Sequence, residues 1–210
     1  MDALFNLIKQ SQKSEQNGDL DASYLVVGLG NPGREYRNTR HNIGFLAIDA
    51  LAKALGVSLG KVQSKALVGQ GKIGSSKVIL VKPQTYMNLS GQSVSGLLNF
   101  YKISTEHLIV IHDDIDLPFG TIRIRPGGGS AGQRGVKSII EKVGTQEFAR
   151  MRLGVGRPPG QMDAAAYVLQ PFTKEDEEFL VNFLSKAAEA ANEFVNNGLN
   201  AAMNKYNGTI

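Results

Sequence analysis

The chain has 210 residues, of which 42% are hydrophobic, and it carries a formal net charge of +4. This length fits one domain with a sizeable core. The absence of cysteine excludes disulfides, thiolate metal sites and a cysteine nucleophile and fits a cytoplasmic protein, and no apolar run reaches the about 18 residues of a membrane span.

Residues 1–23 are expected to form a polar N-terminal extension ahead of a domain at 24–210. The apolar patch at its start is too short for a secretory signal. The acidic residues of this segment argue against an organelle transit peptide; they are Asp2, Glu15, Asp19 and Asp21.

Strands and helices are expected to alternate along the rest of the chain. Short apolar or alternating runs predict strands at 24–28, 66–73, 77–82, 108–111, 121–125 and 151–155, with a hairpin turn at 74–76. Helical spacing predicts helices at 43–55, at 90–101 with Ser90 as N-cap, from the glycine-rich loop 127–132 to about 143, and at 173–196. The pattern predicts an α/β fold: a single domain with a mixed, twisted β-sheet flanked by helices.

Three segments rich in polar residues follow predicted strands, at 28–33, 82–88 and 112–116. Sites in α/β sheets gather at the carboxyl ends of strands, so we expect these segments to share one site. The first one literally matches G-x-G-x-x-G, which would bind a dinucleotide if its last glycine opened a helix. Pro32 interrupts the loop, and the acidic residue at the required distance, Asp49, falls inside the next predicted helix. The loop is therefore expected to present Asn31 in a turn, and no cofactor is expected.

His41 is a candidate general base because Asp113, at the end of another predicted strand, can hydrogen-bond one imidazole nitrogen and leave the other basic. The sequence has neither a G-x-S-x-G elbow nor a cysteine, so this pair indicates activation of water. The basic residues before the histidine suggest an anionic substrate; they are Arg34, Arg37 and Arg40.

A metal site is the alternative for the acidic cluster at 112–116. Adjacent strand residues point to opposite faces, and H-E-x-x-H is missing, so no metal is expected. In the loop 82–90, the amide of Asn88 can bind a carbonyl and the ring of Tyr86 can stack on a base or sugar. The segment 120–157 holds eight Lys and Arg residues and only two acidic ones, which suggests a face that meets phosphate.

Several long blocks, in order, resemble the bacterial peptidyl-tRNA hydrolase family over roughly 24–200. They are V-G-L-G-N-P-G-x-x-Y-x-x-T-R-H-N-x-G-F, K-P-Q-T-Y-M-N-L-S-G, H-D-D-I-D-L-P-F-G, G-G-G-S-A-G and R-L-G-V-G-R-P. The resemblance implies an esterase that cleaves the peptide from the 3′-terminal ribose of peptidyl-tRNA and recycles tRNA from stalled translation. It also implies a cytoplasmic monomer without metal or cofactor that binds the acceptor stem and 3′ end.

The resemblance also implies a role for each matching residue. His41 corresponds to the general base and Asp113 to the carboxylate that orients it. Asn31 corresponds to the amide that distinguishes N-blocked from free aminoacyl-tRNA. Positions that hold the peptidyl end and terminal adenosine are matched by Tyr36, Tyr86 and Asn88, and those that contact tRNA phosphates by Arg125 and Arg152.

One block departs from the family, which usually reads G-G-H-N-G after the glycine loop, whereas this chain has Gly132-Gln133-Arg134-Gly135. Arg134 thus replaces a substrate-binding asparagine, and arginine only donates hydrogen bonds. The altered pair leaves a second hypothesis open, a non-catalytic RNA-binding relative, since related plastid proteins serve intron splicing.

Overall fold

The fold was determined from a computed structural model, which describes residues 22–210. The expectations for residues 1–21 lie outside the described residues. The strands of the described part are β1 (Ser23–Gly28), β2 (Lys61–Gln63), β3 (Ala66–Ile73), β4 (Ser76–Pro83), β5 (Leu108–Asp114), β6 (Thr121–Arg125), β7 (Ala149–Gly154) and β8 (Gly208–Thr209).

The helices surround this sheet. The α-helices are α2 (Ile43–Leu55), α3 (Ser90–Tyr101), α4 (Arg134–Val143), α5 (Ala164–Val168) and α6 (Lys174–Tyr206). Short 3-10 turns are η1 (Arg34–Tyr36), η2 (Arg40–Asn42), η3 (Met87–Leu89) and η4 (Thr105–His107). The predicted α/β class with a mixed, helix-flanked sheet is confirmed.

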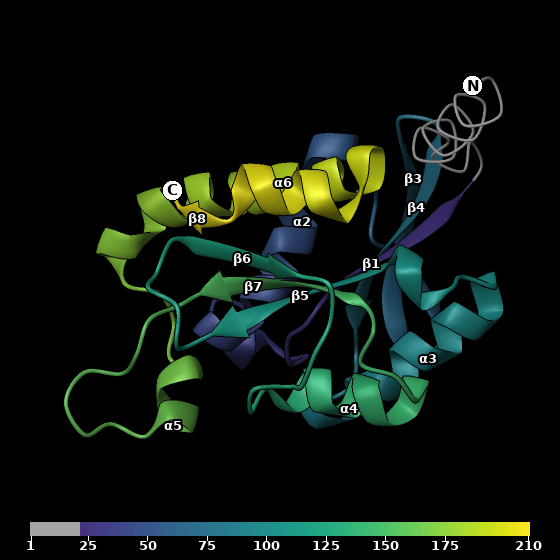
Figure 1. Cartoon of the computed structure of the whole chain (residues 1–210). Coiled ribbons are helices and arrows are strands. Elements are labelled where there is room, and N and C mark those ends of the chain that lie inside the picture. The colour runs from purple at the N-terminus through teal and green to yellow at the C-terminus, as the bar shows by residue number, and fades with distance from the viewer. Residues whose placement is uncertain (1–21) are drawn as a thin grey trace, which may run out of the picture.

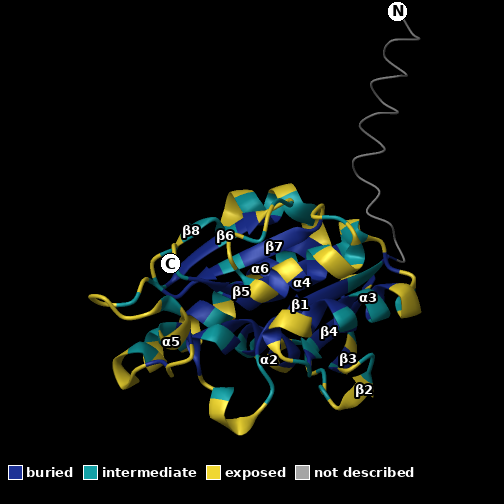
Figure 2. Cartoon of the chain, turned by 90° about the horizontal axis from the view of Figure 1, so that it is seen from below, coloured by how far each residue is buried: buried dark blue, intermediate teal, exposed yellow. Residues whose placement is uncertain are grey.

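The described strands form one sheet in the order β2-β3-β4-β1-β5-β7-β6-β8. The central strands β4, β1, β5 and β7 run parallel, and the pairs at both edges are antiparallel. Helices α2 and α6 cover one face of the sheet, and α3 and α4 cover the other (Figure 1). The central strands are therefore buried, and the exposed residues lie mainly on the helices and loops (Figure 2).

Two predicted details are corrected. Ser90 is not the N-cap of α3: Leu89 holds that position, and the hydroxyl of Ser90 donates to the carbonyl of Met87 (2.8 Å). The last helix runs to Tyr206 rather than 196, with a break at Gly198, whose φ is 82°. The strands β2 and β8 were not predicted, since they are too short to show a hydrophobic pattern.

A glycine contact sets the distance between α2 and the sheet. A Cβ on Gly44, in the first turn of α2, would lie 2.5 Å from the backbone nitrogen of Leu29 and would also meet the carbonyl of Ile111. A Cβ on Gly28 would meet the carbonyl of Gly44 in turn. Since neither residue has a side chain, the start of α2 lies directly against the ends of β1 and β5.

Candidate active site

The carboxyl ends of β4, β1 and β5 bring together the loops that were expected to share a site. Leu29, after β1, donates its backbone N–H to the carbonyl of Ile111 in β5 (2.9 Å). Met87, after β4, donates its backbone N–H to Oδ1 of Asn31 (2.8 Å). The expected convergence is confirmed, at the sheet edge where α/β proteins place their sites.

His41 and Asp113 meet at this edge. Nδ1 of His41, in η2, lies 2.8 Å from Oδ2 of Asp113 in β5. An ionised carboxylate only accepts hydrogen bonds, so Nδ1 carries the proton and Nε2 is the basic nitrogen. The side chain of His41 is 16% exposed and that of Asp113 is 5% exposed, so a substrate can reach the imidazole while the carboxylate is shielded.

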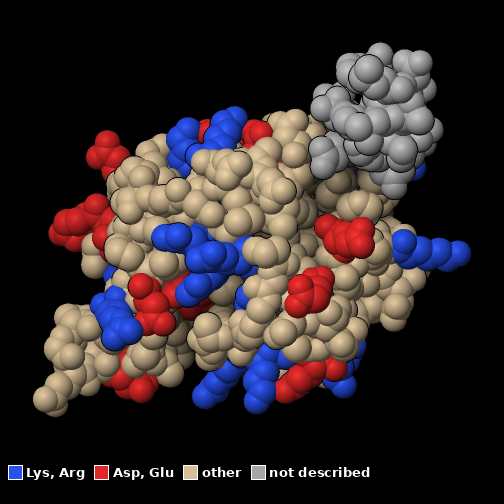
Figure 3. Space-filling view, in the orientation of Figure 1, with Lys and Arg blue, Asp and Glu red and all other residues tan. Residues whose placement is uncertain are grey.

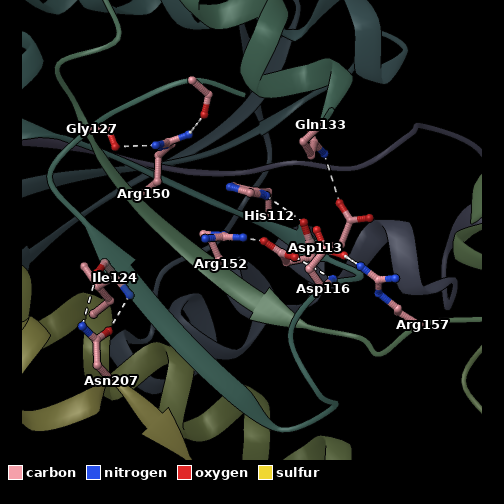
Figure 4. Close-up of polar contacts among 12 residues, drawn as sticks. His112, Asp113, Asp116, Ile124, Gly127, Gln133, Arg150, Arg152, Arg157 and Asn207 are labelled. Carbon is pink, nitrogen blue, oxygen red and sulfur yellow. Dashed lines mark hydrogen bonds and ion pairs between the residues drawn. The ribbon is translucent and has the colours of Figure 1, made fainter. Parts of the chain in front are cut away.

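Asp113 has a second partner, Gln133, which the sequence analysis did not assign to the site. Nε2 of Gln133 donates to Oδ1 of Asp113 (3.0 Å), and Figure 4 shows the amide pointing from the start of α4 toward the carboxylate. Burial by itself raises the pKa of Asp113, but the charge of His41 and hydrogen bonds from His41 and Gln133 outweigh it and lower the pKa. Asp113 is therefore ionised at neutral pH.

Asn42 is another residue of the site that sequence reasoning missed. Its buried side chain accepts a hydrogen bond from the backbone N–H of Asn31 (2.8 Å) and donates one to the carbonyl of Asn31 (2.9 Å). Both the backbone of Asn31 and its side-chain oxygen are thus engaged, and its Nδ2 is left to donate. The signal in the sequence was the position of Asn42, directly after the candidate base.

The three residues expected at the peptidyl end flank this centre. Tyr86 is 61% exposed and directly precedes Met87, which binds Asn31. Asn88 is exposed in η3. Tyr36 is half-buried in η1, between the glycine loop and His41. Within residues 22–210, none of these three side chains is hydrogen-bonded to His41 or Asp113.

Not all arginines near the histidine are free for a substrate. Arg34 and Arg37 are exposed, but Arg40 is buried. Its guanidinium donates to the carbonyl of Pro171 (2.5 Å) and to Asp176 (3.4 Å). The prediction that Arg40 belongs to a basic surround of the site is wrong, because it ties η2 to the start of α6 instead.

Strands β6 and β7 carry a basic face, and β7 pairs with β5, the strand that holds Asp113. Arg123 and Arg125 on β6 stand opposite Arg152 and Arg150 on β7, so all four share one face. Figure 3 shows basic side chains over these strands, with acidic ones beside them, and a further group along the edge where α4 lies. Arg125 is exposed at the end of β6, and Arg134 is exposed in the first turn of α4.

Two of these arginines already have partners. Arg152 is bound to the buried carboxylate of Asp114, and its side chain is 23% exposed. Arg150 donates to the carbonyls of Gly127 and Gly129 and so shapes the glycine loop (Figure 4). Arg125 and Arg134 make no ion pair with the described residues, which leaves their guanidinium groups to solvent or ligand.

His112 and Asp114 point away from the dyad. His112 is buried, and since its Nδ1 faces the carbonyl of Asp113 (2.8 Å), that nitrogen carries the proton. Burial lowers the pKa of His112, against the raising effect of Asp113 and Asp114.

Residues 22–210 contain no group of three His, Asp or Glu side chains placed to hold a metal ion. Within the same range, no helix has both the length and the apolar character to cross a membrane.

The fold and the site define an α/β protein with a His–Asp pair at the carboxyl edge of its sheet, an arrangement that is able to support general-base chemistry. The family model described as peptidyl-tRNA hydrolase matches residues 25–210, and the chain belongs to this family.

Named relatives agree with this assignment. The chain is 51% identical over 182 residues to "Peptidyl-tRNA hydrolase" of Exiguobacterium sibiricum, and the aligned residues cover 87% of this chain and 98% of that protein. It is 47% identical over 182 residues to "Peptidyl-tRNA hydrolase, chloroplastic" of Arabidopsis thaliana, covering 86% of this chain and 63% of that protein. The crystal structure of peptidyl-tRNA hydrolase from Acinetobacter baumannii superposes with a TM-score of 0.83 at 35% identity, over 89% of this chain and 95% of that one.

Proposed function

We propose that the chain hydrolyses the ester between the peptide and the 3′-terminal ribose of peptidyl-tRNA, and so recycles tRNA from stalled or aborted translation. The observation that carries this function is the pair of His41 and Asp113, at 2.8 Å, in a chain of this family. The same pair speaks against the non-catalytic RNA-binding alternative, since binding alone needs no basic nitrogen oriented by a buried carboxylate.

In the proposed mechanism, Nε2 of His41 takes a proton from a water molecule while the oxygen of that water attacks the carbon of the ester carbonyl. Asp113 stabilises the imidazolium that forms, as an orienting carboxylate does in other general-base sites. Nδ2 of Asn31 is free to donate to the oxyanion, because its Oδ1 already accepts from Met87. The carbon–oxygen bond to the ribose then breaks, and the imidazolium returns the proton to the ribose oxygen.

The residues around the dyad are proposed to orient the bound substrate. Tyr36, Tyr86 and Asn88 are proposed to hold the peptidyl end and the terminal adenosine. Arg134 is proposed to meet the carbonyl or phosphate groups near the 3′ end, and Arg125 and Arg152 the phosphates of the acceptor stem.

We further propose that the enzyme acts as a monomer in the cytoplasm. The dyad and its supporting amides all come from one chain, so a second copy is not needed to complete the site. The substrate arises where ribosomes work, which places its hydrolysis in the same compartment.

A single-turnover assay tests the function. With enzyme in excess, N-acetyl-aminoacyl-tRNA should be cleaved, while aminoacyl-tRNA with a free amino group serves as the matched control and should be spared. Absence of cleavage of the N-blocked substrate would instead establish a binding protein of the same family.

A further inference from the structure

Gln133 joins three parts of the site through one amide group. Its Oε1 accepts from the backbone N–H of Val136 (2.9 Å) and caps α4. Its Nε2 donates to Oδ1 of Asp113 (3.0 Å) and lies 3.3 Å from Sδ of Met87. Because the cap requires the oxygen, the orientation of the amide is fixed, and the nitrogen faces the carboxylate.

The hydrogen bond from Gln133 completes the surroundings of Asp113. This carboxylate is buried, with Oδ2 toward His41 and Oδ1 toward Gln133. A buried carboxylate oxygen without a donor is costly, and the group would rotate to recover one. Two donors on opposite oxygens hold the carboxylate in the rotamer that faces the imidazole.

Few other charges act on Asp113. His41 faces it from η2, and His112 adjoins it on β5. On the neighbouring strand β7, the guanidinium of Arg152 is engaged by Asp114. From α4, the group that faces Asp113 is the neutral amide of Gln133. This amide is therefore the contact through which α4 acts on the dyad.

We propose that Gln133 is a positioning residue of the hydrolysis. Its hydrogen bond fixes the rotamer of Asp113 and stabilises the negative charge of that carboxylate, and so sets how readily His41 accepts a proton. The inference rests on the proposed function. Gln133 bonds to neither reacting atom in this scheme, so its effect is expected in kcat and in the pH profile rather than in KM.

Two substitutions separate this role from helix capping. Gln133→Ser keeps a side chain that caps well but cannot reach Asp113. Gln133→Glu keeps the shape and the capping oxygen but places a second carboxylate against Asp113. For Gln133→Ser, we expect kcat to fall on the order of 10-fold, as for loss of one hydrogen bond to a charged group, with KM unchanged.

The pH dependence of kcat is the measurement that a purely structural role of Gln133 would leave unchanged. Without the amide donor, Asp113 turns its full charge to His41 and favours the imidazolium. The acid limb of kcat is then expected to move to higher pH by about half to one unit in Gln133→Ser, and further in Gln133→Glu. Urea unfolding should show that Gln133→Ser remains folded under the assay conditions, with a stability lowered by the loss of the donor to the buried Asp113.

Ser138→Ala is the matched control on the same helix. Ser138 is buried in α4 and accepts from the backbone N–H of Gly91 (3.0 Å), so its loss weakens the contact of α4 with α3 without touching Asp113. It should lower stability and leave the acid limb in place. Parental kcat and pH profile in both Gln133 variants, or the same shift in Ser138→Ala, would overturn the positioning role; a parental chain that cleaves nothing would overturn the proposed function instead.

Discussion

At the scale of single residues, His41 is the side chain on which the proposed chemistry depends. General-base catalysis contributes about 10²–10⁴-fold, so His41→Ala should lower the single-turnover rate by that factor. The affinity for tRNA should remain, because the residues proposed to contact phosphates, Arg125 and Arg152, lie on other elements. The two quantities are measured by cleavage of N-acetyl-aminoacyl-tRNA and by filter binding of the same tRNA. Parental cleavage by His41→Ala would refute the mechanism.

His112 predicts a stability effect distinct from catalysis. Its pKa is lowered by burial, so the folded chain keeps it neutral while the unfolded chain takes up a proton below pH 6.5. The unfolded state therefore binds more protons than the folded state, and the free energy of unfolding falls as the pH falls. His112→Asn keeps a donor for the carbonyl of Asp113 but does not titrate.

The slope of unfolding free energy against pH should therefore be smaller in His112→Asn, by up to about 1.4 kcal/mol per pH unit. Urea titrations between about pH 7 and about pH 5 measure it. Asp113 does not interfere in this range. Its lowered pKa contributes stability at neutral pH, and this stability is lost only as the pH falls through the ordinary value of 3.8 and below. Equal slopes for both chains would show that His112 accepts its proton in the folded state.

At the scale of elements, the close approach of α2 to the sheet brings the base to its carboxylate. Gly44→Ala would place a methyl group 2.5 Å from the backbone of Leu29, where no side chain can move aside. The start of α2 must shift, and His41 in the adjoining η2 shifts with it. We expect a loss of about 1–3 kcal/mol in unfolding free energy and a lower cleavage rate.

Gly60→Ala is the control for that substitution. A Cβ there would lie 3.9 Å from Oγ of Ser58, which is ordinary van der Waals contact, and Gly60 has no positive φ. It should leave both stability and cleavage near the parental values. If Gly44→Ala is equally harmless, the contact between α2 and the sheet has more freedom than the packing indicates.

Local periodicity was sufficient to predict the long elements, and tertiary contacts were needed for the rest. The apolar spacing of residues 43–55 predicts α2 with its bounds, because that spacing reports the buried face directly. Arg40 looked like part of a basic surround, since its partners, Pro171 and Asp176, are more than a hundred residues away in the sequence. Gln133 was noticed only as a departure from a motif, because its contact with Asp113 forms only when the fold brings the N-terminal end of α4 to the end of β5.

At the scale of the whole molecule, arginine side chains gather on one face of β6 and β7, next to the strand that carries Asp113. The resemblance to the family led to the expectation that Arg125 and Arg152 contact phosphates. The structure shows how to test that expectation cleanly. Arg152→Ala would leave the buried carboxylate of Asp114 unpaired, which destabilises the fold itself. Arg125 is exposed and forms no ion pair with residues 22–210, so its removal changes the surface charge alone.

Arg125→Ala should therefore weaken tRNA binding and reduce the slope of log K against log salt by about 1, the value for one lost phosphate contact. Lys186→Ala removes the same charge from α6, on the opposite face of the sheet, where Lys186 pairs with Glu189. It should leave the slope at the parental value. Binding of the same tRNA over a range of salt concentrations measures both. Equal slopes in the two variants would mean that attraction comes from net charge alone, and that tRNA does not lie along the face of β6 and β7.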